Sequence, residues 1–239
     1  MTDRFRELHA EGFFVMPNPW DRGSASALEA MGFLALATTS AGFAHSLGKA
    51  DQEVARDELV AHVADLTAVL DVPLNVDSER LYPDDPGGID EAVRLLADAG
   101  AAGCSIEDYD PARSAIVPVE EATDAVATAA SACARHGLVL TARAENHLYG
   151  HDDLDDTIAR LVAYRDAGAE VLYAPLLASP DDIGRAVREV GGPINVLGVP
   201  GTPPMAELRE LGVRRVSTGG WLHSVAADAM RRTAATYLD

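Results

Sequence analysis

Two acidic residues, Asp77 and Glu79, follow the short apolar run Pro73-Leu74-Asn75-Val76 and are separated by one residue. Because the side chains of a strand alternate between its two faces, both acids are predicted to share a face with Asn75. Carboxylates that share one face at a strand end are typical of two arrangements, a bound divalent cation or a shared proton. The sequence therefore predicts chemistry at this strand end and leaves both arrangements open.

Polar residues also follow several other short apolar runs. If the ends of these runs meet in one place, oxygen ligands such as Asp77, Glu79 and Glu107 favour Mg²⁺ or Mn²⁺ over zinc. Arg143 can clamp a carboxylate, and a cation beside it suits the stabilisation of an enolate formed from a small 2-oxo acid. The polar groups at the run ends are Asn18 and Asp21, Thr39 to Gly42, Glu107 and Asp108, Arg143, Glu145 and Asn146, and Asn195.

Short apolar runs alternate with longer Ala-rich amphipathic stretches along the whole chain, which predicts parallel strands joined by helices. Glycine follows several of the helical stretches, for example at Gly100 and Gly168, as is typical of a helix end. A compact (β/α)₈ TIM barrel, a single domain over residues 1–239, is the expected fold. The alternative is a doubly wound open sheet, but no Gly-x-Gly-x-x-Gly turn follows the first strand. Strands are expected at 14–16, 34–38, 74–77, 103–107, 139–143, 171–173, 194–197 and 215–217, and helices at 24–31, 52–70, 89–99, 119–135, 153–167, 181–190, 204–211 and 220–237.

The charge balance argues against nucleic acid and membrane surfaces as partners. The chain has 19 Lys and Arg residues against 38 Asp and Glu residues, a formal net charge of −19, which repels phosphate groups. We expect a cytoplasmic protein, because no stretch approaches the roughly 20 apolar residues of a membrane span and the N-terminus leads into no signal-like run. The single lysine, Lys49, lies in a polar stretch, so a Schiff-base mechanism is not expected.

Several segments, taken in order, make the chain similar to the isocitrate lyase and phosphoenolpyruvate mutase superfamily over nearly its whole length. Each is short, and the specificity comes from their combination. They are Asn18-Pro19-Trp20-Asp21, Thr38-Thr39-Ser40-Ala41-Gly42, Ser46-Leu47-Gly48 with Asp51, Val76-Asp77-Ser78-Glu79, Ser105-Ile106-Glu107-Asp108, Thr141-Ala142-Arg143, Leu172-Tyr173-Ala174-Pro175 and Asn195-Val196-Leu197.

The resemblance implies a barrel that binds Mg²⁺ together with a 2-oxo acid or its enolate. It also implies a homo-oligomer, a dimer or tetramer, in which the C-terminal helix is exchanged. His45, beside the Ser-Gly turn, is a further candidate acid. The candidate residues are Ser40, Ala41, Gly42, Arg143, Asn195 and Trp20 for a small carboxylate substrate, Asp77, Glu79 and Glu107 for the metal, and Arg143, Asp51 and His45 for catalysis, with Asp51 also near the metal.

Two segments depart from the family pattern. Glu79 stands where the family commonly has aspartate, so the carboxylate reaches one methylene farther. The loop Tyr109 to Ser114 lacks the Lys-Cys-Gly-His stretch whose cysteine is the catalytic acid or base of lyases in this family. The leading hypothesis is a Mg²⁺-dependent lyase or hydrolase acting on a C–C or P–C bond next to the carbonyl of a 2-oxo acid. The alternatives are a phosphonomutase and a barrel that binds without catalysis.

Overall fold

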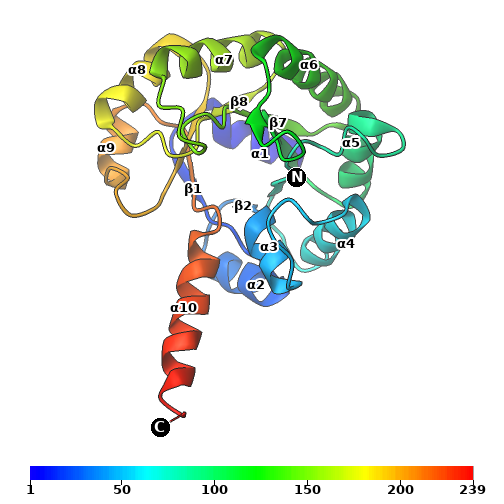
Figure 1. The fold of residues 1–239 in the computed structure, drawn as a ribbon, viewed down its shortest axis with the longest axis vertical. Helices are drawn as coiled ribbons and strands as arrows, with labels where there is room; N and C mark the ends of the chain where they lie inside the picture. The colour runs from blue at the N-terminus through cyan, green and yellow to red at the C-terminus, as the bar shows by residue number, and fades with distance from the viewer. Residues whose placement is uncertain (239) are drawn as a thin grey trace.

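The computed structural model describes residues 1–238 and shows an eight-stranded parallel sheet curved into a (β/α)₈ barrel (Figure 1). The strand order is β1-β10-β9-β8-β7-β4-β3-β2. The two edge strands approach each other, since the Ala37 N–H donates to the Pro17 carbonyl at 3.1 Å and the Asn18 amide donates to the Thr38 carbonyl at 2.6 Å. The expected TIM barrel is therefore confirmed.

All eight predicted strands are present, and the second and third are shorter than expected. The barrel strands are β1 (Phe14–Met16), β2 (Leu36–Ala37), β3 (Leu74–Val76), β4 (Gly103–Glu107), β7 (Val139–Arg143), β8 (Val171–Tyr173), β9 (Ile194–Leu197) and β10 (Arg215–Ser217). A small antiparallel hairpin, β5 (Tyr109–Asp110) with β6 (Ala115–Ile116), follows β4.

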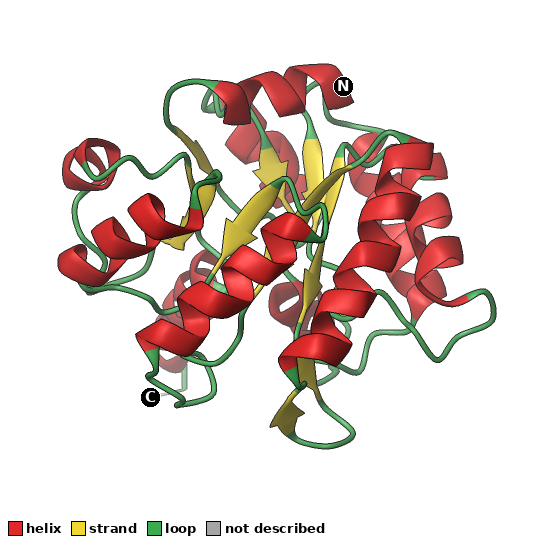
Figure 2. Ribbon diagram, turned by 90° about the horizontal axis from the view of Figure 1, so that it is seen from above, coloured by secondary structure: helices red, strands yellow, loops and turns green. Residues whose placement is uncertain are grey.

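Helices surround the strands (Figure 2). Two of them, α1 and α3, and the hairpin were not predicted from the sequence. The helix expected from residue 52 begins at Arg56, because Gln52 has a left-handed φ of 69°. The helices are α1 (Thr2–Ala10), α2 (Arg22–Ala30), α3 (Ser40–Ser46), α4 (Arg56–Thr67), α5 (Gly88–Asp98), α6 (Val119–His136), α7 (Leu154–Asp166), α8 (Pro180–Val190), α9 (Met205–Glu210) and α10 (Trp221–Ala235).

Helix α1 closes the amino-terminal end of the barrel. Its Phe5 is fully buried and belongs to a separate apolar cluster inside the barrel with Phe14, Val139 and Val171. Gly103, the first residue of β4, is required by this contact, since a Cβ there would lie 2.8 Å from Phe5 Cε1. The inner cavity of the barrel consequently has a closed base.

Helix α10 extends away from the barrel (Figure 1). The structure describes all of its residues, and none is buried, although Trp221, Val225 and Met230 are large apolar side chains. Within residues 1–238, none of the helices combines the length and the hydropathy needed to cross a bilayer.

Candidate functional site

Arg143, the last residue of β7, is the centre of a buried charge network. Its guanidinium contacts Asp77 and Glu145 at 2.6 Å each and Glu107 at 3.4 Å, and it lies over the Tyr173 ring at 5.3 Å. Burial alone would lower the pKa of Arg143, but the surrounding carboxylates raise it well above the usual range. Arg143 therefore stays charged and is held in position by its carboxylate partners.

Asp77 lies immediately after β3 and bonds to the first turn of α3. The Ser40 N–H and hydroxyl each donate to Asp77 Oδ2 at 2.9 Å, and the Asp77 N–H donates to the Thr38 hydroxyl at 2.8 Å. The predicted Ser-Gly turn is thus the start of a helix, with Thr39 as its cap accepting from the Gly42 N–H at 3.2 Å. No larger residue fits at position 42, because a Cβ there would meet the Thr39 methyl at 2.6 Å.

Glu79 is not placed by strand alternation, in contrast to the expectation. The strand ends at Val76, and Glu79 has a left-handed φ of 49°, followed by Leu81 at 59° and Tyr82 at 49°. Its carboxylate lines a neighbouring cavity of about 320 Å³, and its Oε1 is buried without a hydrogen-bond partner. Burial, followed by the charges of nearby Asp77 and Asp51, raises the pKa of Glu79 to about 8.

Glu107 and Glu145 complete the acidic shell around Arg143. The Gln52 amide donates to Glu107 Oε1 at 2.8 Å, and the Glu107 N–H donates to the Glu79 carbonyl at 3.0 Å. Burial raises the pKa values of Glu107 and Glu145, in opposition to the charge of Arg143. Gln52 was not selected from the sequence, because its approach to the site depends on a left-handed backbone with a φ of 69°.

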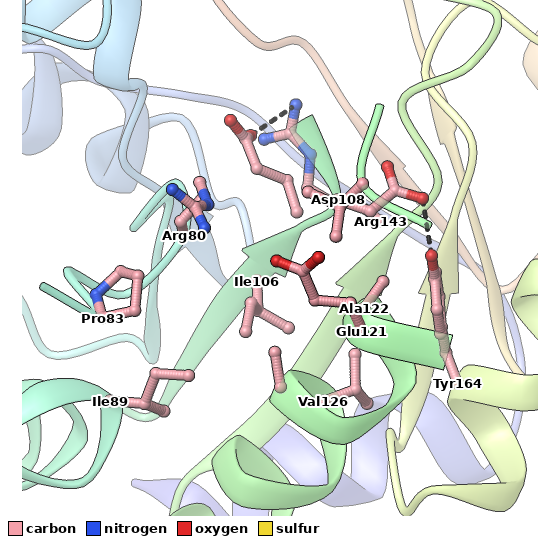
Figure 3. Close-up of a pocket in the computed structure, with 13 residues that line it drawn as sticks. Arg80, Pro83, Ile89, Ile106, Asp108, Glu121, Ala122, Val126, Arg143 and Tyr164 are labelled. Atoms are coloured by element: carbon pink, nitrogen blue, oxygen red, sulfur yellow. Dashed lines mark hydrogen bonds and ion pairs between the residues drawn. The ribbon is translucent and has the colours of Figure 1, made fainter. Parts of the chain in front are cut away.

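Asp108 faces away from the acidic shell toward the helices. Its carboxylate accepts from the Tyr164 hydroxyl at 2.5 Å, from Arg160 at 3.0 Å and from the Glu145 backbone N–H at 2.8 Å. Figure 3 shows Tyr164 directed at Asp108, with Arg143 nearby, beside a cavity of about 50 Å³ that is lined mainly by apolar side chains. Asp108 therefore anchors the backbone of the residue that orients Arg143.

A larger cavity of about 310 Å³ opens among the carboxyl ends of the strands. The predicted residues that line it are Ser40, Ala41, Asp51, Asp77 and Arg143. Partial burial and the charge of Asp77 raise the pKa of Asp51. The geometry thus brings together the central part of the predicted site.

The other predicted residues lie around this cavity without lining it. Gly42 is buried in the first turn of α3. Glu107 accepts from the Gln52 amide, and Glu79 lines a neighbouring cavity together with Gln52. The rings of Trp20 and His45 lie 5.2 and 4.9 Å from that of His223, at the start of α10. Asn195 is buried inside the barrel, where its amide donates to Ser217 at 2.9 Å. Lining residues to which no role was assigned from the sequence include Ser105, Thr141, Arg215 and Trp221.

The donor set suits a hard cation such as Mg²⁺. Every candidate ligand is a carboxylate oxygen, and the Glu79 Oε1 has no hydrogen-bond partner. Burial, followed by the charge of Asp77, raises the pKa values of Glu79 and Asp51. Across residues 1–238 no three Asp, Glu, His or Cys side chains form a ready-made metal cage. Mg²⁺ is compatible with this arrangement, because it commonly takes one or two carboxylates and completes its shell with water and substrate.

The hairpin after β4 is attached to the barrel through several side-chain contacts, among them the ion pair of Arg113 with Glu121 of α6 at 3.0 Å. The Tyr109 ring stacks on Tyr149 with centroids 3.5 Å apart, and Arg80 forms an ion pair with the buried Asp110 at 3.2 Å. This hairpin occupies the place of the loop that carries the catalytic cysteine in lyases of the family that the sequence resembles. Residues 109–118 contain no cysteine.

Comparisons with known proteins agree on one family. The phosphoenolpyruvate phosphomutase family model matches residues 5–238. A Burkholderia cenocepacia J2315 protein provisionally described as a lyase/mutase is 47% identical, and its crystal structure matches with a TM-score of 0.93 over 98% of this chain and 87% of that one. An uncharacterized Mycobacterium tuberculosis H37Rv protein is 36% identical, with 98% of this chain and 89% of that protein covered. The structure of 2,3-dimethylmalate lyase is 25% identical, with a TM-score of 0.88 over 98% of this chain and 86% of that one. The chain therefore belongs to the phosphoenolpyruvate phosphomutase family, within the isocitrate lyase and phosphoenolpyruvate mutase superfamily of lyases and mutases.

Proposed function

We propose that the protein is a Mg²⁺-dependent enzyme that breaks or forms a C–C or P–C bond next to the carbonyl of a small 2-oxo acid. The observation that carries this proposal is Arg143, an arginine held among buried carboxylates at the edge of a cavity of about 310 Å³. Mn²⁺ could replace Mg²⁺, because both cations prefer oxygen ligands.

The residues of the chain have distinct tasks in this scheme. Ser40 and Ala41, which line the cavity, would bind the substrate carboxylate, and Arg143 would donate to the oxygens of the reacting carbonyl. Glu145 keeps the guanidinium in place by accepting from Arg143 Nε at 2.6 Å. Asp51, which lines the cavity and has no salt-bridge partner within residues 1–238, would accept or return a proton.

Asp77, Glu79 and Glu107 would hold the cation, directly or through water. When bound, Mg²⁺ would withdraw charge from the oxygens of a 2-oxo acid and so stabilise an enolate. The Ser40 N–H and hydroxyl both donate to Asp77 Oδ2 at 2.9 Å, so a substrate carboxylate at Ser40 would have to replace Asp77 as their acceptor.

Calorimetry with oxalate, a planar mimic of the enolate of a 2-oxo acid, tests the proposal. We expect Mg²⁺ or Mn²⁺ to strengthen oxalate binding at least tenfold and Asp77→Ala to abolish the enhancement. Asp84→Ala, which removes an exposed acid from the loop after the same strand, is the matched control and should keep it. If the oxalate affinity is the same with and without the cation, or if oxalate does not bind, the enzyme proposal is refuted and a barrel that binds other molecules is favoured.

A phosphonomutase is the second candidate, because the matching family model is that of phosphoenolpyruvate phosphomutase. A panel of 2-oxo acids, including oxaloacetate and phosphonopyruvate, should be assayed for cleavage products. Release of pyruvate or oxalate would support bond cleavage, whereas conversion of phosphoenolpyruvate to phosphonopyruvate without cleavage would support the mutase.

We also propose that the chain forms a homo-oligomer through α10. This helix extends from the barrel and leaves Trp221, Val225 and Met230 exposed, which is unusual for three large apolar side chains on one helix. Light scattering should show a dimer or tetramer, and Met230→Glu should reduce the measured mass toward that of one chain. A monomeric wild-type protein would refute this assembly.

A further inference from the structure

Arg215, the first residue of β10, points into the barrel and is only 2% exposed. It lines the same cavity as Arg143, although the two arginines come from different strands and lie in different charge environments. Burying a guanidinium in this way requires compensation, because a buried charge without a partner is costly.

All hydrogen-bond partners of Arg215 are neutral. Its Nε donates to Asn195 Oδ1 at 2.8 Å and its Nη2 donates to the Thr141 hydroxyl at 3.0 Å. The third partner is His9 Nε2, at 3.1 Å from Nη1, which accepts because His9 Nδ1 donates to the Phe5 carbonyl at 2.8 Å. Since a guanidinium has five N–H groups, these three bonds leave two N–H groups for other partners.

The other deeply buried arginines of the chain have acidic partners. Arg143 contacts three carboxylates, and Arg160 pairs with Asp108 at 3.0 Å and with Asp156 at 2.8 Å. In the part of the chain that the structure describes, no carboxylate lies within 4 Å of Arg215. Burial lowers the pKa of Arg215 to about 9, so that the side chain still carries its charge at neutral pH.

Asn75 supplies a second unsatisfied group on the same cavity. It is 4% exposed, it lines the cavity, and its Oδ1 has no hydrogen-bond partner. A side-chain amide can present either its oxygen or its N–H groups, depending on its orientation. Ser105, Thr141 and Ser217 also line this cavity, and the Thr141 hydroxyl accepts from Arg215.

We propose that the inner end of the cavity is an anion-binding subsite, in which Arg215, with Asn75 and neighbouring hydroxyls, binds a small monoanion such as a carboxylate or a halide. Two sources would supply this chemistry. One is the second acidic group of a substrate, which rests on the proposed function, and the other is a free anion that neutralises the barrel interior independently of any reaction.

Bromide is the first probe, because it can be located by anomalous scattering. In crystals soaked with bromide, we expect a peak within hydrogen-bond distance of the Arg215 guanidinium. In solution without Mg²⁺, bromide at constant ionic strength should raise the unfolding temperature of the wild type in a saturable manner. Arg215→Gln should abolish this response, and Arg214→Gln, which removes the partly exposed neighbouring arginine, should keep it.

Arg215→Lys is the second variant, in case Arg215→Gln fails to fold. Because lysine keeps the positive charge, this variant should still bind bromide, with at least tenfold weaker affinity. The proposal is overturned if no anomalous peak lies near Arg215 in the wild type. It is equally overturned if wild type, Arg215→Lys and Arg215→Gln respond to bromide alike, which would leave Arg215 with only a structural role.

Displacement distinguishes the two sources. With Mg²⁺ present, release of bromide by oxaloacetate but not by pyruvate would identify the subsite as that of a second substrate carboxylate. Retention of bromide with both acids would identify a separate anion site. The failure of the proposed function is recognised independently, since it would abolish the Mg²⁺ dependence of oxalate binding while leaving bromide at Arg215.

Discussion

Acidification should destabilise the protein through His9, whose imidazole is buried between the rings of Phe5 and Phe14, with centroid distances of 4.7 and 5.1 Å. Burial, followed by the positive charge of Arg215, lowers the pKa of His9 to about 3. In the unfolded chain a histidine titrates near 6.5. The unfolded state therefore binds more protons than the folded state between these values, and stability must fall as the pH drops below about 6.5.

The size of this effect follows from the two pKa values. Between pH 7.5 and pH 5, proton binding to the unfolded state alone should reduce the free energy of unfolding by about 2 kcal/mol for His9. His62, whose pKa burial lowers to about 4, should add a similar amount. Replacement of His9 by glutamine removes the first contribution and keeps a neutral side chain that can accept from Arg215.

Urea unfolding at the two pH values measures the difference directly. The loss of stability on acidification should be about 2 kcal/mol smaller in His9→Gln than in the wild type. His136→Gln, at a partly exposed position at the end of α6, controls for the removal of a histidine. An equal loss of stability in His9→Gln and wild type would show that His9 is not buried as a neutral acceptor beside Arg215.

Three other substitutions test the packing that supports the site. Phe5→Ala should lower the free energy of unfolding by about 3–5 kcal/mol, measured in urea, because it empties the base of the barrel. Glu145→Gln should weaken Mg²⁺-dependent oxalate binding about tenfold in calorimetry, a change of ~1.4 kcal/mol, because Arg143 loses the carboxylate on its Nε. Unchanged affinity would contradict this orienting role. Tyr164→Phe should cost about 1–3 kcal/mol in thermal unfolding, since Asp108 loses a buried hydrogen bond, and an unchanged transition would argue against that anchor.

The barrel was predictable because the strands are short apolar runs and an amphipathic helical stretch separates each strand from the following one. The unpredicted elements have weak patterns. Helix α1 is rich in charged residues and uses essentially two side chains, Phe5 and His9, as its buried face. Helix α3 begins at the Ser-Gly segment that reads as a turn, and the strands of the β5–β6 hairpin have two residues each.

The site was predictable where residues belong to regular strands and less so where backbone conformation decides. Arg143 and Glu107 end strands whose limits were predicted correctly, and their side chains meet at 3.4 Å. Glu79 does not follow the alternation of side chains along a strand, because its φ is 49°. A glutamate rarely adopts this left-handed conformation, so the sequence does not predict it. Arg215 gave no signal at all, because an arginine at the start of a strand ordinarily reaches solvent.

Because α1 closes the amino-terminal end of the barrel, the cavity opens at the carboxyl ends of the strands. With Phe5 filling the amino-terminal end and His9 bonded to Arg215, molecules must enter and leave past the carboxyl ends of the strands. A ligand fragment at the depth of Arg215 would therefore depart only after any fragment nearer to Ser40 and Asp77 had gone. If the reaction divides its substrate in two, the order in which the halves are released is already determined by the first ten residues of the chain.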